Sequence, residues 1–252
     1  GWVERQRNAI APGGPWPVSD AAAALHETLT IGDWHADTLL WNRPLLERGD
    51  RGHVDLPRLI EGNVAVQVFT AVTKSPAGQN YEANSADAFD NITPLAMAQL
   101  WPPRTWGSLL ARALYQAERL ERAARASEGR LAVIRSEADL DAVRAARVAG
   151  EPVVGGLLGI EGAHALEGDL ANLDALTDAG YRLVGLTHFF DNAVGGSLHG
   201  QGDRGLTDFG RSLVDEIAAR GLILDLAHAA PAVAREVIAQ TDMPLIVSHT
   251  GI

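Results

Sequence analysis

Seven histidine, aspartate and glutamate residues in this chain each lie at or just after the end of a short apolar run. Imidazole and carboxylate groups are ordinary zinc ligands, and thiolate ligands are excluded because the chain has no cysteine. Metal ions held by such groups can activate water and polarise a carbonyl group for hydrolysis. The residues that carry this hypothesis are His35, Asp37, Glu161, His188, Asp225, His228 and His249.

The spacing of His35 and Asp37 suits a shared metal ion. Residues i and i+2 of a strand point to the same side, so this imidazole and this carboxylate could hold one ion. A single glutamate on another strand, Glu161, could bridge two ions through its two oxygens, and two further histidines could complete the second ion. Two ions about 3.5–4 Å apart would activate a bridging water and polarise a carbonyl.

Each of these residues also has a structural interpretation. A single histidine at a strand end is more often a hydrogen-bonded structural residue than a ligand, and His-x-Asp alone is a weak motif. Glu161 is harder to explain by packing, because a carboxylate that follows a long apolar strand needs a partner. The other histidines are interpreted as structural or surface residues, although His199, in a Gly-rich loop, could reach a substrate; they are His26, His53, His164 and His199.

The elements that would position these side chains follow from the apolar periodicity. Short apolar runs predict strands at 29–37, 64–72, 153–160, 183–187, 222–226 and 245–248. Helical spacing and capping residues predict helices at 20–26, 109–125, 170–179, 207–220 and from Pro231 onward. This alternation is typical of a parallel α/β fold, in which the carboxyl ends of the strands open onto one face. The candidate ligands are therefore expected to converge.

We predict a (β/α)8 TIM-type barrel of the metallo-hydrolase type. The apolar runs provide six strands, fewer than the eight of a closed barrel. Either the last one or two βα units are missing from this chain, which we expect, or the fold is not a full barrel. Residues 1–28 are predicted to form an irregular lead-in and a short helix, and residues 29–252 a single catalytic barrel domain. The segment at about 74–150, with its polar loops and helical spacing, is interpreted as a helical insertion.

The composition argues against several functional classes. A formal net charge of −11 does not suit nucleic-acid binding, which needs clustered Lys and Arg. No G-x-G-x-x-G motif follows a strand, which argues against nucleotide and redox enzymes. No apolar stretch reaches 18 residues, the length that indicates a transmembrane helix. Because the chain starts at Gly1 rather than Met, an upstream signal or membrane anchor is compatible with it, and we favour an exported or membrane-associated (periplasmic) location over the cytoplasm.

Several segments of the chain resemble the membrane dipeptidase (renal dipeptidase) family of zinc peptidases, peptidase family M19. They occur in the family's order from about residue 29 to the end, and the set is specific although each piece alone is weak. The segment at about 74–150 matches less distinctly. The matching segments are Asp33–Asp37, Gly62–Gln67, Gly159–His164, Gly185–His188 with Asn192, Leu224–His228 and Val247–His249.

The resemblance implies a role for each strand-end residue. His35 and Asp37 would hold one Zn²⁺, His228 and His249 the other, and Glu161 would bridge them. His188 resembles the family histidine that contacts the substrate and stabilises the developing oxyanion. The cofactor implied is thus two Zn²⁺ per chain, with Glu161 and His188 as the catalytic residues and His188 as the substrate-binding residue.

The implied reaction is hydrolysis of the peptide bond of a dipeptide by a metal-bridging hydroxide. The family accepts D-residues at the second position of the dipeptide, and it commonly forms homodimers. Its substrate-gripping Arg and proton-handling Asp follow the last zinc histidine. Neither can be assigned here, because the chain ends three residues after His249. The chain as it stands is therefore expected to bind metal with its activity in doubt.

Two alternatives remain open. The first is an amidohydrolase-type metal hydrolase of cyclic amides or esters, a class that usually begins with His-x-His on the first strand. Asp37 at the second of these positions favours the dipeptidase interpretation, and a panel of dipeptides, lactones and hydantoins would separate the two. The second alternative is an inactive barrel that serves as a scaffold, which the complete native sequence would test.

Overall fold

The computed structural model describes residues 2–14 and 16–249 of the chain. The described residues divide into two compact units, which we treat separately. The first unit comprises residues 1–69 and 119–157, and the second comprises residues 70–118 and 158–252. Strands β2 (Val64–Val72) and β4 (Val154–Glu161) and helix α6 (Leu109–Ala126) each pass from one unit into the other.

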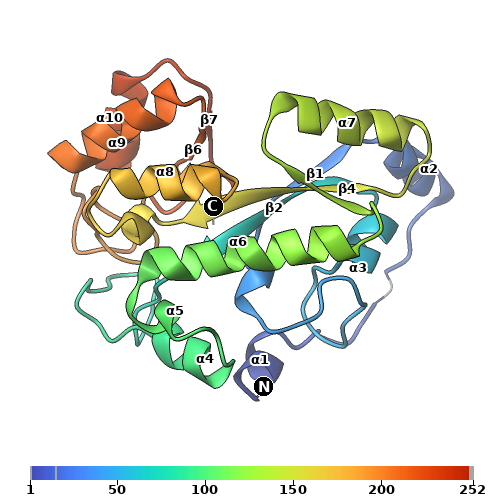
Figure 1. Cartoon of the computed structure of the whole chain (residues 1–252), viewed down its shortest axis with the longest axis horizontal. Coiled ribbons are helices and arrows are strands. Elements are labelled where there is room, and N and C mark those ends of the chain that lie inside the picture. The colour runs from blue at the N-terminus through green and yellow to red at the C-terminus, as the bar shows by residue number, and fades with distance from the viewer. Residues whose placement is uncertain (1, 15, 250–252) are drawn as a thin grey trace. The chain divides into compact units, whose positions relative to one another are not determined.

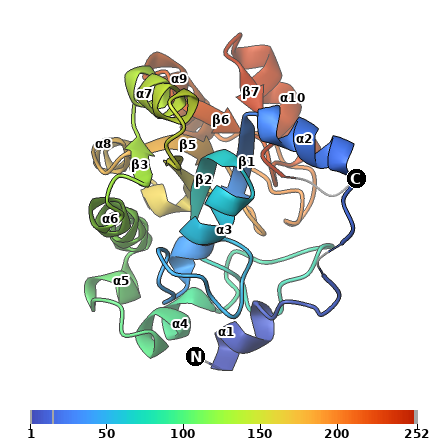
Figure 2. The same ribbon diagram turned by 90° about the vertical axis from the view of Figure 1, so that its right-hand side faces the viewer.

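The first unit is built on parallel strands. Strand β1 (Ile31–Ala36) pairs with β2, and β3 (Leu131–Ile134) pairs with the start of β4 in the register Leu131↔Val154 to Ile134↔Leu157. Helix α7 packs against β3 (Figure 2). The helices and 3-10 turn of this unit, besides part of α6, are α1 (Trp2–Arg7), α2 (Asp20–Thr28), η1 (Thr38–Leu40), α3 (Leu56–Glu61) and α7 (Glu137–Val148).

Glycines in β4 explain how the first-unit strands pack so closely. A Cβ atom added at Gly155 would lie 2.4 Å from the Ile134 side chain, and one at Gly156 would lie 3.2 Å from the Phe69 ring. Both neighbouring side chains are buried. The Gly-rich run that suggested a buried strand therefore leaves room for larger side chains from β2 and β3.

The second unit continues the parallel pairing from the end of β4. Strands β5 (Tyr181–Gly185), β6 (Ile223–Asp225) and β7 (Leu245–Ile246) pair in sequence order (Figure 2). Helices α9 and α10 pack beside each other, and α9 packs on β6 (Figure 1). The helices of this unit, besides part of α6, are α4 (Ile92–Ala98), α5 (Arg104–Gly107), η2 (Ala163–Leu166), α8 (Ala171–Asp178), α9 (Asp208–Ala219) and α10 (Pro231–Gln240).

Local sequence signals fix the helices that flank these strands. The Thr207 hydroxyl accepts a hydrogen bond from the Gly210 N–H at 3.0 Å and caps α9, while Leu213 and Ile217 bury its apolar face. Tyr181 of β5 is fully buried and donates its hydroxyl hydrogen to the Ala113 carbonyl of α6 at 2.8 Å. This bond ties the amino-terminal part of α6 to the second-unit strands.

The α/β class and the parallel strands predicted from the sequence are confirmed. Each predicted strand is present, and β2 has the predicted bounds. The sequence interpretation missed β3, which lies inside the predicted helical insertion and is only four residues long. It also missed α1, which lies in the predicted irregular lead-in. Among the described residues, no helix has both the length and the apolar character needed to cross a bilayer.

Candidate metal centre

Three imidazoles of the second unit surround one carboxylate oxygen. The Oε1 atom of Glu161 lies 3.2 Å from Nε2 of His228 and 3.4 Å from Nε2 of both His188 and His249. The Nε2 atoms of His228 and His249 are only 2.8 Å apart. Four of the sequence-predicted site residues are therefore brought together, and their ligand-type atoms point toward a common point.

The parallel strands explain this convergence. Glu161 is the last residue of β4, and His188, His228 and His249 each lie three residues beyond the end of β5, β6 and β7. The register pairs Ile160 with Val184, Gly185 with Asp225, and Asp225 with Ile246, so the strand ends are aligned. Side chains that follow aligned parallel strands share one edge of the sheet.

His228 is held in a backbone conformation that a non-glycine residue rarely adopts. Its φ angle is 62°, in the left-handed region. Its carbonyl oxygen accepts hydrogen bonds from the Thr187 hydroxyl at 2.9 Å and from the Leu198 N–H at 2.8 Å. These bonds hold the unfavourable conformation in place, as is common where a side chain must be aimed at a functional site.

Hydrogen bonds behind His249 set the tautomer of its neutral ring. The Asp225 carboxylate can only accept, so the Ser248 hydroxyl donates to it, and the Ser248 oxygen then accepts from Nδ1–H of His249 at 2.9 Å. Nε2 of His249 is therefore the nitrogen that carries the lone pair. Asp225 was a strand-end candidate in the sequence, but its carboxylate binds the Ala227 and Ser248 N–H groups and orients a neighbouring histidine.

Gly162 allows the end of β4 to approach His188. A Cβ atom at this position would lie 3.1 Å from Cβ of His188 and 2.3 Å from the His164 ring, and the φ angle of 88° also suits glycine. His164 itself is buried beside Phe190, with 5.0 Å between the ring centroids. Burial, helped by the neighbouring His188, lowers the pKa of His164 to about 3, so this ring is neutral at physiological pH.

The first unit holds the other two sequence-predicted ligands. Nε2 of His35 lies 3.4 Å from Oδ1 of Asp37; the His35 side chain is 14% exposed and that of Asp37 is 33% exposed. The His35 N–H donates to the Asp33 carboxylate at 3.1 Å, at the point where β1 pairs with β2. An imidazole and a carboxylate thus lie side by side at the end of β1, and their ligand role stays a prediction.

The chemistry of the second-unit donors fits a divalent cation. Glu161, His188 and His228 each offer one ligand atom, and these atoms lie within 4.8 Å of one another. Imidazole nitrogens and a carboxylate oxygen are the donor set that zinc accepts. The predicted presence of a metal is thus compatible with the side chains that the fold brings together.

An aromatic cluster beside these histidines was not predicted. The Phe189 ring lies 4.9 Å from His188 and 5.2 Å from His228, and His199 stacks on Phe189 with 4.7 Å between centroids and an interplanar angle of 19°. Tyr81 packs against both Phe189 and His199. The only sequence signal was the Gly-rich loop around His199, because Tyr81 lies 118 residues earlier in the chain.

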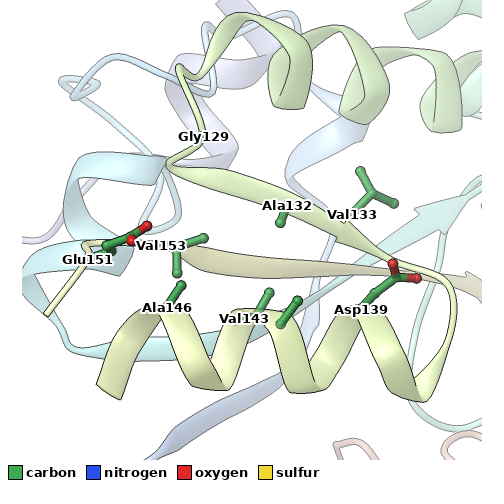
Figure 3. A pocket seen from close by; sticks show the side chains of 9 residues that line it. Gly129, Ala132, Val133, Asp139, Val143, Ala146, Glu151 and Val153 are labelled. Atoms are coloured by element: carbon green, nitrogen blue, oxygen red, sulfur yellow. The ribbon is translucent and has the colours of Figure 1, made fainter. Parts of the chain in front are cut away.

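A groove in the first unit offers a contrast to this centre. It has a volume of about 190 Å³ and lies between α7 and the strands β3 and β4 (Figure 3). Its walls are mainly Ala and Val side chains, with Asp139 and Glu151 as its only ionisable lining residues. Hydrogen bonds from the backbone N–H of Arg135 and from the hydroxyl of Ser136, the N-cap of α7, lower the pKa of Asp139, so local bonds at the start of α7 hold this carboxylate.

Comparison with known proteins gives a consistent set of relatives. The family model described as membrane dipeptidase (peptidase family M19) matches residues 19–252. The solved structure of dipeptidase AC, a metallopeptidase of family M19, is 27% identical with a TM-score of 0.67, and the match covers 88% of this chain and 64% of that one. A metallopeptidase from Rhodobacter sphaeroides, solved with a phosphinate mimic of the dipeptide L-Ala-D-Ala, is 26% identical with a TM-score of 0.63, covering 88% and 65%.

A more distant relative shows likeness of fold alone. The probable dipeptidase PvdM from Pseudomonas aeruginosa is 18% identical with a TM-score of 0.69, and the match covers 91% of this chain and 54% of that one. Across these comparisons the chain spans between about half and two thirds of the length of the solved chains.

Proposed function

The chain belongs to the membrane dipeptidase family (peptidase family M19), and on that premise we propose that it hydrolyses the peptide bond of dipeptides as a metallopeptidase. The resemblance predicted from the sequence is thereby confirmed over residues 19–252. The observation that carries the proposal is the convergence of His188, His228 and His249 on one oxygen of Glu161.

We propose that the cofactor is two Zn²⁺ ions. His228 and His249 would bind one ion, His35 and Asp37 the other, and Glu161 would bridge them. The second-unit geometry supports the roles of Glu161, His228 and His249, whereas those of His35 and Asp37 rest on the family resemblance. When bound, the ions supply Lewis acidity toward the scissile carbonyl and toward water.

The chain's own residues then orient the reactants. His188 would donate a hydrogen bond to the oxygen that gains negative charge, where a donor has the greatest effect on rate. Asp225 and Ser248 hold the ring of His249, and the backbone of His228 is fixed by Thr187 and Leu198. A D-residue at the second position is part of the proposal, supported by the ligand of the Rhodobacter sphaeroides relative.

The finer predictions on architecture, location and assembly are also kept as proposals. The parallel βα alternation supports a (β/α)8 barrel, and the family match supports an exported or membrane-associated setting. A homodimer is proposed on the family resemblance alone.

The primary test is metal content and turnover on protein purified without chelator and supplied with Zn²⁺. We expect close to two zinc ions per chain and hydrolysis of dipeptides, including L-Ala-D-Ala, in a panel that also contains lactones and hydantoins. Hydrolysis of the cyclic compounds in preference to dipeptides would point to an amidohydrolase-type activity instead. No metal uptake and no turnover would reject the proposal.

His188 needs a test of its own, because its Nε2 atom is as close to Glu161 as that of His249. We expect His188→Ala to keep both metal ions and to lower kcat by about 10²- to 10³-fold, as for loss of one oxyanion donor. Metal content per chain and kcat are measured on the same preparation. A loss of bound metal in this variant would make His188 a ligand and overturn its assignment as a substrate contact.

A further inference from the structure

The lone-pair nitrogen of His199 has no role in the function described above, although the ring lies in the same unit as the candidate metal centre. Its centroid is 5.3 Å from that of His228, and it stacks on Phe189, which in turn contacts His188 edge-on. Resting on the proposed dipeptidase function, we propose that His199, with Phe189 and Tyr81, binds the terminal ammonium group of the dipeptide.

The tautomer of the neutral His199 ring follows from its hydrogen bond. Nδ1 lies 3.0 Å from the carbonyl oxygen of Tyr81, and a carbonyl can only accept. Nδ1 therefore donates, and in the neutral ring Nε2 presents the lone pair that accepts hydrogen bonds. The His199 side chain is half-buried.

His199 is held in place by two separate loops. The Asn84 backbone N–H and side-chain amide both donate to the His199 carbonyl at 2.9 Å. The His199 N–H donates to the Ser197 hydroxyl at 3.1 Å, and that hydroxyl donates to the His188 carbonyl. The backbone of His199 is thus linked through the Ser197 hydroxyl to the backbone of His188.

The loop that contributes Tyr81 and Asn84 is anchored at its base. Asp90 accepts a hydrogen bond from the Ser75 N–H at 3.1 Å, and the buried Arg112 donates to Asp90 at 2.6 Å. Asn91 N–H donates to the Ser75 carbonyl at 2.8 Å, which closes the loop. A loop fixed at both ends can hold a binding residue with little loss of entropy when the substrate arrives.

The chemistry of this cluster selects the ammonium end of a dipeptide. A lone-pair nitrogen repels the carboxylate and the carbonyl oxygens, whereas the ammonium is the charged donor of the substrate. The face of an aromatic ring also attracts a cation, and the exposed ring of Tyr81 lies beside His199. The ammonium nitrogen lies only about 2.5 Å from the scissile carbonyl carbon, because two bonds separate them. A side chain that binds the ammonium must therefore lie next to the cluster of His188, His228 and His249, and the His199 ring contacts His228.

The test compares two ligands that differ only in this group. L-Ala-D-Ala has the ammonium, and propionyl-D-alanine lacks it but keeps the peptide N–H and the carboxylate. We would measure kcat and KM for the dipeptide, and the Kd of both compounds by calorimetry, on metal-loaded protein. His199→Phe keeps a flat ring on Phe189 without an acceptor, and His199→Gln restores an acceptor. The matched control is His53→Phe, at an exposed histidine of the first unit.

We expect His199→Phe to raise KM and Kd for L-Ala-D-Ala by about 10- to 100-fold, the usual effect of losing a hydrogen bond to a charged group, with kcat changed only a few-fold. The Kd of propionyl-D-alanine and the metal content should not change, and His199→Gln should recover most of the dipeptide affinity. The inference would be overturned if His199→Phe raised the Kd of both compounds equally, changed the Kd of neither, or lost bound metal.

These outcomes separate the inference from the proposed function. An active, metal-loaded wild type whose His199→Phe variant binds the dipeptide normally would reject the role of His199 and leave the dipeptidase function intact. A wild type that binds neither compound and takes up no metal would reject both.

Discussion

Two buried polar clusters of the second unit, one around Arg112 and one around Glu161, are completed in different ways. Arg112 pairs with Asp90 at 2.6 Å and also donates to the carbonyl oxygens of Thr73 and Thr105 and to the Thr93 hydroxyl. Burial opposes ionisation of Asp90, but hydrogen bonds led by that of Arg112 hold its pKa below the ordinary value. Folding alone thus satisfies this pair.

The Glu161 cluster is built from a different set of groups. Three imidazoles face Oε1 of Glu161, and the hydrogen-bond chain through Ser248 leaves Nε2 of His249 as a lone-pair donor. Imidazole nitrogens and a carboxylate oxygen that meet at one point are the donor set that a divalent cation accepts. The difference teaches that burial and polarity alone do not mark a functional site; the types of group that the fold brings together do.

Replacing each carboxylate by its amide should separate the two clusters most clearly. We expect Glu161→Gln to lose bound metal and to lower kcat/KM by at least about 10³-fold, because the bridging carboxylate would serve both ions. The overall fold should persist. Metal analysis and steady-state kinetics on the same preparation check this, with Glu151→Gln in the first-unit groove as a control that should match the wild type. Retention of both ions in Glu161→Gln would count against a bridging role.

The opposite outcome is expected for the amide at Asp90. Asp90→Asn leaves the buried Arg112 guanidinium without its counter-charge, which should lower the free energy of unfolding by about 3 kcal/mol. Urea unfolding measures this loss, and metal content of the folded protein should stay at the wild-type level. The control is Glu118→Gln, because its ion pair with Arg104 is half-exposed and should contribute less than about 1 kcal/mol. Equal destabilisation by both variants would remove the distinction between the two pairs.

The hydrogen-bond chain behind His249 predicts a smaller effect. Ser248→Ala would release Nδ1 of His249 and leave the ring without its fixed orientation, so metal affinity should fall by about 10- to 100-fold. Competition with a chelator measures this affinity. Ser248→Thr keeps the hydroxyl and should bind metal as the wild type does. Similar weakening by both substitutions would assign the effect to packing rather than to the hydrogen bond.

The sequence predicted the strands better than it predicted what lies between them. Apolar runs such as Val64–Val72 mark a buried parallel strand directly, and the ligand-type residue after each run marks the edge where strands end. By contrast, β3 is too short to show a period, and its burial depends on glycines in β4. The role of Asp225 could not be predicted either, because its partner Ser248 is 23 residues away and joins it only through the pairing of β6 with β7.

The histidines outside the strand ends show the same limit. His199 and Tyr81 meet through two loops, so no local pattern connects them. The sequence interpretation makes His164 a structural or surface residue in a loop, and the structure buries it beside Phe190. Its burial depends on Gly162, whose missing side chain makes room for the ring. Loop contacts of this kind depend on tertiary packing, which sequence periodicity does not encode.

The burial of His164 leads to the smallest effect that we predict. Its pKa is lowered to about 3 in the folded chain and is about 6.5 when the chain is unfolded. Between these two pH values His164 therefore binds a proton in the unfolded state but not in the folded state. Stability should therefore fall as the pH drops from 6.5 toward 3. Between pH 7.5 and pH 5.0 this residue should cost the wild type about 1–2 kcal/mol.

His164→Leu removes the titrating group while keeping an apolar side chain beside Phe190. Urea unfolding of this variant and of the wild type, at both pH values, should show a smaller acid-side loss for the variant. Other histidines titrate in both proteins, so their contribution cancels in the difference. His53→Leu, at an exposed position, should retain the full wild-type pH dependence. An identical pH dependence of the unfolding free energy in His164→Leu and the wild type would mean that burial does not hold His164 neutral in the folded chain.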